Sequence, residues 1–271
     1  MPQFIELTDF SLPILQAFNA LSEAQLLHYY EPDLGIFVAE SALVIGRALD
    51  AGYEPIALIS ERKRAFAQEA AILERCGDVP VYIQDEEVLN DFLGFKLIRG
   101  PLCVMRRKPV PDAEVLCKNA RRIAVLEHVT NPTNVGAIVR SAAALGIEAV
   151  LLTEGCADPL YRRAERVSMG TAFRMPWGYL SEDRYIDLDK LHRMGFQTAA
   201  MALREDSVSI ADPALRKEEK LAILLGEEGY GLCDETIRGA DYTVLIPMAP
   251  GIDSLNVAAA SAVAFWELRS R

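Results

Sequence analysis

Between residues 120 and 268, short continuous apolar runs alternate with segments of helical periodicity. The runs 123–126, 149–152 and 221–225 lack the polar–apolar alternation of a half-exposed strand, so they predict strands that are buried on both faces. The segment 134–145 has apolar residues at helical spacing and stops at Gly146. Strands that alternate with helices form a mostly parallel sheet, and ligands of such sheets bind at the carboxyl ends of the strands.

Two prolines, Pro109 and Pro111, follow a run of three basic residues and mark a domain boundary, because proline interrupts both helices and strand ladders. We expect a linker over residues 108–119. Strand-like and helix-like segments also alternate before it: strands over 35–39, 56–59, 79–83 and 103–105, and helices over 42–51 and 63–75. The sequence therefore predicts an α/β chain with one domain over 1–112 and another over 113–271.

Composition limits the class of protein. Of 271 residues, 51% are hydrophobic and 25% are charged, which is typical of a globular chain. The most apolar stretch, 255–266, is too short to span a bilayer, and the first ten residues lack the basic and apolar runs of a signal peptide. The five cysteines are scattered and form no CxxC pair. We expect a reduced, cytoplasmic protein with no membrane segment and no metal site.

The net charge of −11 argues against a nucleic-acid partner, because phosphates are attracted by basic surfaces. Binding of RNA would then depend on a local basic patch. The candidate residues for such a patch are Arg106, Arg107, Lys108, Arg162, Arg163 and Arg166.

Several common enzyme motifs do not occur. The chain has three histidines and no HExxH, no GxSxG, no GxxxxGK[ST] phosphate loop and no GxGxxG after a first strand. These absences argue against a metal enzyme, an α/β-hydrolase, a P-loop NTPase, a conventional dinucleotide-binding enzyme and a conventional Rossmann methyltransferase.

Three polar, glycine-containing stretches follow predicted strands. In the first, 131–140, an Asn or Thr caps the helix and leaves backbone amides facing an anion. Arg140 shares a helix face with Gly136 and Ala144, so a ligand can approach it closely. The alternative interpretation is a capped helix with one solvated arginine.

The second stretch, 224–232, has three glycines and two adjacent acids after an apolar run. Glycine permits positive φ and close approach of a ligand to the backbone, although the acids of such a turn can also merely cap the next helix. In the third, 246–257, two prolines stiffen a loop that leads to a predicted N-cap at Ser254, and Asn256 points out of the first helical turn. The alternative here is a rigid entry to the helix.

The order and spacing of the three stretches resemble the SpoU/TrmH-type branch of the SPOUT methyltransferases, which transfer a methyl group from S-adenosylmethionine to a ribose 2′-hydroxyl of RNA. The family motifs are found here as N-x-G-x-x-x-R from Asn134, G-x-E-x-x-G from Gly226, and I-P-M at 246–248 followed by S-L-N-V at 254–257. The resemblance covers about 120–268 and includes the stretch 166–176.

The resemblance implies a trefoil-knotted parallel-sheet methyltransferase domain, preceded by a smaller L30e-like α/β domain that binds RNA (rRNA or tRNA). It also implies S-adenosylmethionine as the cofactor, no metal, and a homodimer formed through the C-terminal domain. The cofactor-binding residues carried over are Gly226, Ile246, Met248 and Leu255, and the catalytic residues are Asn134, Arg140, Glu228, Ser254 and Asn256. Arg140 would orient the hydroxyl and its neighbouring phosphate, since a guanidinium stays protonated and cannot act as a base.

The sequence departs from the family pattern at two places. Glu227 stands where the family has a small or amide residue, and Ala258 and Ala259 stand where a serine is common. The extra acid beside the cofactor loop can alter the choice of substrate. Two alternatives stay open: a catalytically inactive knotted RNA-binding protein, and a methyltransferase with a non-RNA acceptor.

Overall fold

The computed structural model describes residues 1–29, 34–181, 183–227, 229–252 and 254–270. The chain divides into two compact units. The first unit comprises Met1–Pro109 and Leu160–Phe173, and the second comprises Val110–Pro159 and Arg174–Arg271. None of the helices in the described ranges is long and apolar enough to cross a membrane.

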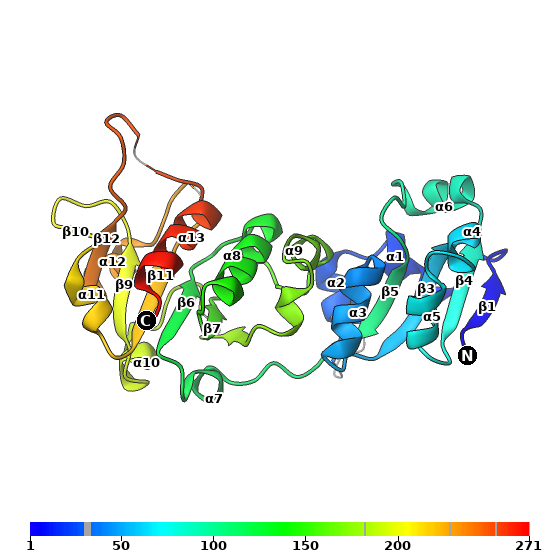
Figure 1. The fold of residues 1–271 in the computed structure, drawn as a ribbon, viewed down its shortest axis with the longest axis horizontal. Coiled ribbons are helices and arrows are strands. Elements are labelled where there is room, and N and C mark those ends of the chain that lie inside the picture. Colours follow the sequence, from blue (N-terminus) through cyan, green and yellow to red (C-terminus); the bar gives the residue numbers. More distant parts are fainter. Residues whose placement is uncertain (30–33, 182, 228, 253, 271) are drawn as a thin grey trace. The chain divides into compact units, whose positions relative to one another are not determined.

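The first unit is built on a five-stranded sheet with the order β1-β4-β3-β5-β2 (Figure 1). Its strands are β1 (Gln3–Glu6), β2 (Ile36–Glu40), β3 (Pro55–Glu61), β4 (Pro80–Gln84) and β5 (Leu102–Arg106). Strands β1, β4 and β3 are parallel, and β5 runs antiparallel to both of its neighbours. The strands predicted before the linker are confirmed. The edge strand β1 was not predicted, because all four of its residues are exposed and give no buried apolar run.

Short helices surround this sheet. They are α1 (Gln16–Asn19), α2 (Glu23–Leu27), α3 (Ala42–Asp50), α4 (Arg62–Ala65), α5 (Ala70–Arg75), α6 (Glu86–Leu93) and α9 (Arg162–Val167). The single helix expected over 63–75 is instead divided into α4 and α5. The chain turns after Phe66, and the turn brings the carboxylate of Glu69 to 2.5 Å from the hydroxyl of Ser60.

The segment 160–173 is part of the first unit although it lies between strands of the second. Helix α9 packs on β2, where the fully buried Glu165 accepts the backbone N–H of Glu40 at 3.1 Å. Arg162 and Arg166 form ion pairs with the Glu40 carboxylate at 3.2 and 3.1 Å. Burial raises the pKa of Glu165. This charged cluster fixes α9 to the sheet.

The sequence also predicts a short strand near Phe173, and the structure places that strand a few residues farther along the chain. Phe173 ends a short 3-10 helix (Thr171–Phe173), and its ring packs against those of Phe37 and Tyr53 at centroid distances of 5.7 and 5.3 Å. The strand of this region follows it instead, at β8 (Trp177–Tyr179).

The second unit has a seven-stranded sheet that is parallel throughout, as the sequence predicted. Its order is β10-β12-β9-β11-β6-β7-β8. The strands besides β8 are β6 (Arg122–Leu126), β7 (Ala149–Leu152), β9 (Gln197–Met201), β10 (Val208–Ser209), β11 (Leu221–Leu225) and β12 (Tyr242–Leu245). Every residue of β6, β7 and β11 is buried, which explains their continuous apolar runs.

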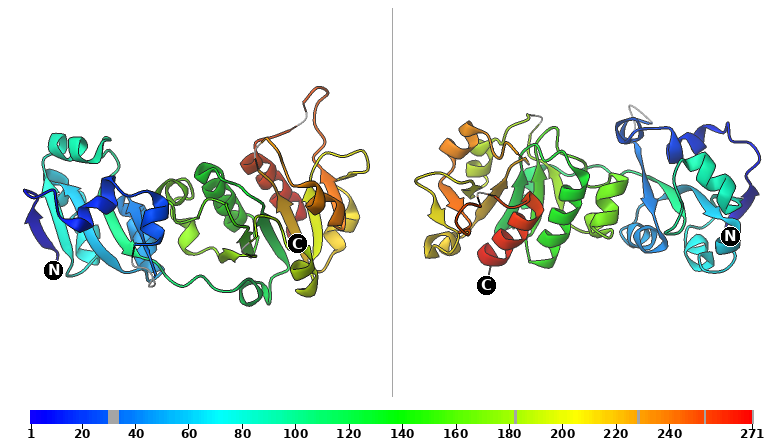
Figure 2. Two further views of the ribbon diagram at one scale, coloured as in Figure 1. Left: turned by 180° about the vertical axis from the view of Figure 1, so that it is seen from behind. Right: turned by 90° about the horizontal axis from the view of Figure 1, so that it is seen from above.

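Helices cover both faces of this sheet. They are α7 (Ala113–Cys117), α8 (Pro132–Ala144), α10 (Leu188–Arg193), α11 (Pro213–Lys217), α12 (Asp234–Gly239) and α13 (Val257–Leu268). Helices α8 and α13 pack together on one face (Figure 2). On the other face, alternate strand residues such as Val125 and Leu224 share a core with Cys117 and Leu191. Because all strands of this sheet are parallel, the loops that follow β6, β11 and β12 leave it on the same side, at the carboxyl ends of the strands.

Candidate functional site

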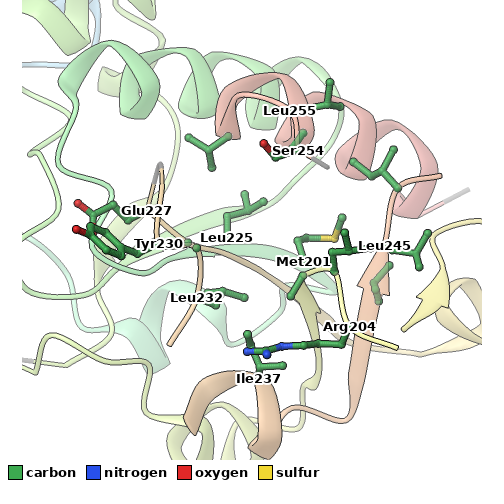
Figure 3. A pocket seen from close by; sticks show the side chains of 18 of the residues that line it. Met201, Arg204, Leu225, Glu227, Tyr230, Leu232, Ile237, Leu245, Ser254 and Leu255 are labelled. Atoms are coloured by element: carbon green, nitrogen blue, oxygen red, sulfur yellow. The ribbon is translucent and has the colours of Figure 1, made fainter. Parts of the chain in front are cut away.

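A cavity of about 600 Å³ lies at the carboxyl ends of β9, β11 and β12 (Figure 3). This is the edge of the sheet at which ligands of open α/β folds bind, and the volume is in the range of small-molecule sites. Its walls are largely apolar. The apolar lining residues include Met201, Leu225, Leu232, Ile237, Leu245 and Leu255.

The loop after β11 forms one wall of the cavity and closes on itself as a tight turn. Glu227 and Gly231 form an isolated antiparallel bridge, with Glu227 N–H donating to Gly231 O at 3.2 Å and Gly231 N–H donating to Glu227 O at 3.0 Å. Gly229 and Gly231 have φ of 96° and 72°, so their predicted left-handed conformations are confirmed.

Gly226 has a different requirement. A Cβ on this residue would lie 2.2 Å from the backbone of Gly231 and of Leu232. Glycine is needed there because the chain itself, rather than a ligand, approaches the backbone.

Loops that are distant in the sequence meet at this cavity. The cofactor-binding residues predicted from the sequence, Gly226, Ile246, Met248 and Leu255, all line it. Of the predicted catalytic residues, Ser254 and Asn256 line it as well. Glu228 lies outside the described residues. The structure thus brings the second and third motifs together, and the role of each residue stays a prediction.

Asn256 connects the third motif to the first. Its Nδ2 donates to Oδ1 of Asn134 in α8 at 3.3 Å. Its own Oδ1 accepts the N–H groups of Ala258 and Ala259 at 3.0 and 3.3 Å, so Asn256 is the N-cap of α13. The expected N-cap at Ser254 is wrong. Asn256 takes this position because the helix begins at Val257, and its side chain folds back over the first turn.

Asn134 has a buried donor that finds no hydrogen-bond partner in the described part of the chain. The residue is 5% exposed, and its Nδ2 makes no hydrogen bond within the described ranges. A buried amide group without a partner costs about 1–3 kcal/mol. Asn134 does not line the cavity itself, but its hydrogen bond from Asn256 connects it to a residue that does.

Arg140 lies farther along α8, where its side chain is exposed. Its guanidinium makes no hydrogen bond or ion pair with any residue of the described ranges, and it does not line the cavity. Asn131, the first residue of the stretch 131–140, caps this helix by accepting the N–H of Thr133 at 2.9 Å, which confirms the expected Asn or Thr cap. Arg140 is therefore free to contact an anionic ligand outside the cavity.

The proposed basic patch is largely occupied. Arg162 and Arg166 are paired with Glu40, Arg107 is only 6% exposed, and Lys108 donates to the carbonyl of Ala51 at 2.6 Å. Arg163 stays exposed. Acids and carbonyls of the protein already engage several of the six candidates, and their contact with phosphates stays a prediction.

Sequence reasoning missed His128, which it considered only as a metal ligand. His128 has a φ of 52°, and its Nδ1 lies 3.2 Å from Oε2 of Glu227 on the cavity wall. Its backbone N–H donates to Oγ1 of Thr153 at 3.1 Å. A Cβ at Gly155 would lie 2.8 Å from the imidazole Cδ2, so the ring needs a glycine beside it.

Glu127, the residue before His128, was missed as well. It is 3% exposed, and its carboxylate accepts the backbone N–H of Cys233 at 2.6 Å, the hydroxyl of Thr236 at 2.5 Å and the N–H of Ile186 at 3.2 Å. Through these bonds the end of β6 holds the start of α12, and with it the turn after β11. The only sequence signal is an acid directly after a buried strand.

In the described residues, no group of three His, Cys, Asp or Glu side chains is arranged to hold a metal ion.

The comparison with known families assigns the chain to one of them. The profile of the SpoU rRNA methylase family matches residues 121–266, which include all three motifs. The chain belongs to the SpoU rRNA methylase family.

Relatives of this SpoU-family chain extend beyond the matched region. An uncharacterised tRNA/rRNA methyltransferase of Mycobacterium bovis is 40% identical over 241 residues, which cover 87% of this chain and 83% of the relative. The 23S rRNA (guanosine-2′-O-)-methyltransferase RlmB of Acinetobacter baylyi is 28% identical over 209 residues, 72% of this chain and 81% of RlmB. The crystal structure of an AdoMet-bound rRNA methyltransferase from Sinorhizobium meliloti superposes with a TM-score of 0.78 at 25% identity, covering 98% of this chain and 97% of that one.

Proposed function

We propose that this chain transfers a methyl group from S-adenosylmethionine to a ribose 2′-hydroxyl of RNA. The observation that carries the proposal is the meeting of the second and third SpoU motifs at one cavity, with Asn134 of the first motif hydrogen-bonded to the cavity-lining Asn256. The family and the names of the relatives support an RNA methyltransferase, and the RlmB relative supports ribose as the methylated group.

The cofactor of this chain is S-adenosylmethionine, the ligand bound by the Sinorhizobium meliloti neighbour. The cavity fits it. Leu225, Leu245 and Leu255 offer apolar surface to a flat heterocycle, and the turn at 226–231 and the loop at 246–248 offer backbone polar groups to its hydroxyl and amino groups. Gly226, Ile246, Met248 and Leu255 would hold it.

The bound cofactor would supply a methyl group that its sulfonium has already activated. The residues of this chain then have to hold the ribose hydroxyl in line with that methyl, at about 3–3.5 Å. Ser254 and Asn256 line the cavity and would contact the hydroxyl, while Asn134 accepts a hydrogen bond from the Asn256 amide and so positions it. Together with Glu228, they form the proposed ring of hydrogen bonds around the acceptor.

Arg140 has a separate role in this proposal. Its exposed guanidinium can form two parallel hydrogen bonds to a phosphate, and so place the attached ribose. Since a guanidinium does not release its proton at neutral pH, Arg140 positions the substrate and stabilises charge, and does not act as a base.

The same proposal includes three features implied by the family resemblance. The second unit carries a trefoil knot, the residues 1–112 form an L30e-like RNA-binding domain, and two chains pair through the C-terminal domain. Exposed apolar residues on α13, Val263 and Trp266, support the pairing.

Transfer of radiolabelled methyl groups from S-adenosylmethionine to unmodified rRNA and tRNA tests this function. A 2′-O-methylated linkage resists alkaline cleavage, because the hydroxyl that attacks the phosphate is blocked, so the label should appear in alkali-resistant dinucleotides. Label in a base would refute ribose methylation. RNA binding without transfer would favour the inactive RNA-binding alternative, and label on other molecules alone would favour a non-RNA acceptor.

A further inference from the structure

Tyr230 is the most exposed aromatic residue beside the cavity. It is 91% exposed, and it stands on the tight turn that the Glu227–Gly231 bridge closes. Figure 3 shows its side chain with that of Glu227 at one side of the cavity, which both residues line. An aromatic ring that is exposed on a constrained turn offers a flat surface for a second ring. Stacking of unpaired bases on such rings is a common mode of RNA recognition.

Glu227 is held in place beside this ring. Its Oε2 lies 3.2 Å from Nδ1 of His128, whose own position is fixed by Thr153 and by the space left at Gly155. Its Oε1 has no hydrogen-bond partner within the described part of the chain, and the side chain is 24% exposed. The carboxylate therefore presents acceptor capacity to a ligand at the cavity.

An acid in this position restricts which part of an RNA can approach. A carboxylate repels phosphate groups and accepts hydrogen bonds only, so any part of an RNA that contacts it has to be a hydrogen-bond donor. In RNA, donors other than the ribose hydroxyls lie on the edges of the bases. Glu227 and Tyr230 together thus provide a stacking surface and an acceptor for one base.

We propose that Glu227 and Tyr230 bind the base of the methylated nucleotide, and that this base is guanine; this inference rests on the RNA ribose methylation proposed above. Guanine presents two adjacent donors on its Watson–Crick edge, N1–H and the 2-amino group, which match the two oxygens of a carboxylate. Uracil has a single donor between two acceptors, and adenine and cytosine each place an acceptor beside their amino group. Glu227 would form two charge-assisted bonds with guanine alone.

The first experiment identifies the product. Unmodified rRNA and tRNA transcripts are methylated by the full-length protein, digested to nucleosides and analysed by mass spectrometry. We expect 2′-O-methylguanosine. A different 2′-O-methylnucleoside would overturn the guanine proposal and leave ribose methylation standing, whereas no transfer to either RNA would refute the proposed function and, with it, the inference.

The second experiment tests the residues on a synthetic RNA that carries the mapped site with either guanosine or inosine, which lacks the 2-amino group. We expect inosine to lower kcat/KM of the wild-type protein about 10- to 100-fold, the effect of one hydrogen bond to a charged group. Glu227→Gln should lower kcat/KM on the guanosine RNA by a similar factor. The kcat/KM of this variant should change little when inosine replaces guanosine. An equal response of both proteins to inosine would refute the contact.

Tyr230 is tested with a matched pair. Tyr230→Ala should lower kcat/KM about 5- to 100-fold, whereas Tyr230→Phe, which keeps the ring, should stay near the wild-type value. Glu74→Gln, at an exposed acid of α5 in the first unit, controls for the loss of one negative charge. The Kd of S-adenosylmethionine, measured by calorimetry, separates base binding from cofactor binding. A rise in this Kd that accounts for the lost activity would overturn the proposal.

Discussion

The amide of Asn256 donates to the side-chain oxygen of Asn134 at 3.3 Å, across 122 positions of sequence. This single contact joins the helix N-cap of α13 to the first turns of α8, and it fixes the orientation of the Asn134 amide, whose Nδ2 group has no partner in the described ranges. The structural and the proposed catalytic role of Asn256 are carried by different atoms, Oδ1 and Nδ2, and substitutions can separate them.

We expect Asn256→Asp and Asn256→Ala to behave differently. Aspartate keeps the oxygen that caps α13 and loses the donor to Asn134, so the protein should keep its stability and lose most of its methyl transfer. Alanine removes the cap as well and should cost a further ~0.5–2 kcal/mol in the free energy of unfolding. Urea denaturation and single-turnover transfer measure the two effects. Full activity of Asn256→Asp would contradict the proposed role of the amide.

Arg140→Ala should lower methyl transfer about 100-fold or more and leave the Kd of S-adenosylmethionine nearly unchanged, because Arg140 does not line the cavity. Arg140→Lys should recover part of the activity, since lysine keeps the charge without the two-pronged geometry. Single-turnover kinetics and calorimetry provide the readouts. The assignment fails if the alanine variant loses cofactor binding while the chemical step is preserved.

The buried Glu165 gives the protein a specific pH dependence of stability. Burial raises the pKa of Glu165 above its value in the unfolded chain. The contribution of Glu165 to the free energy of unfolding is therefore fully present below about pH 4.3 and is lost as the pH rises through the folded pKa. Glu165→Gln carries no charge and should be more stable than the wild type at pH 8, with the difference vanishing near pH 4. Thermal denaturation at several pH values measures this, with Glu74→Gln as the exposed control. A pH-independent difference would show that the Glu165 carboxyl does not ionise in this range.

S-adenosylmethionine should bind in the presence of excess chelator, because the described residues hold no cluster of metal ligands. Calorimetric titration with and without EDTA is the measurement. Loss of binding on chelation would contradict the metal-free site.

Sedimentation equilibrium of the full-length protein should show a dimer at micromolar concentration. Trp266 and Val263 are 57% and 41% exposed on α13, and we expect Trp266→Glu to shift the equilibrium to monomer, since a charge cannot be buried unpaired in an apolar interface. Phe66→Glu, at a residue 60% exposed in the first unit, should leave the dimer intact. A monomeric wild type would refute the pairing, and dissociation by Phe66→Glu would place the interface elsewhere.

Local pattern was sufficient to predict the parallel sheet and the convergence of the motifs. Continuous apolar runs mark strands buried on both faces, and the carboxyl ends of parallel strands lie at one edge by geometry. The exposed edge strand β1 has no such pattern, and the break between α4 and α5 depends on a hydrogen bond from Ser60 to Glu69.

Long-range partners of charged residues could not be predicted. Glu40 lies more than 100 positions from Arg162 and Arg166 in the sequence. The sequence around these two arginines therefore gave no sign of the ion pairs that they form in the structure. The contact between His128 and Glu227 spans 99 positions, and neither residue belongs to the motif pattern. Such pairs are decided by tertiary packing, for which a single sequence gives no local signal.

The placement of Leu160–Phe173 means that the polypeptide passes between its two units three times, at residues 109/110, 159/160 and 173/174. The N-terminal part is therefore not a detachable module. A protease cut in the proline-containing linker would leave both pieces associated through α9. A fragment starting at residue 113 would carry Glu165 without the strand that buries it, and grafting a foreign N-terminal domain would require replacement of 160–173 at the same time.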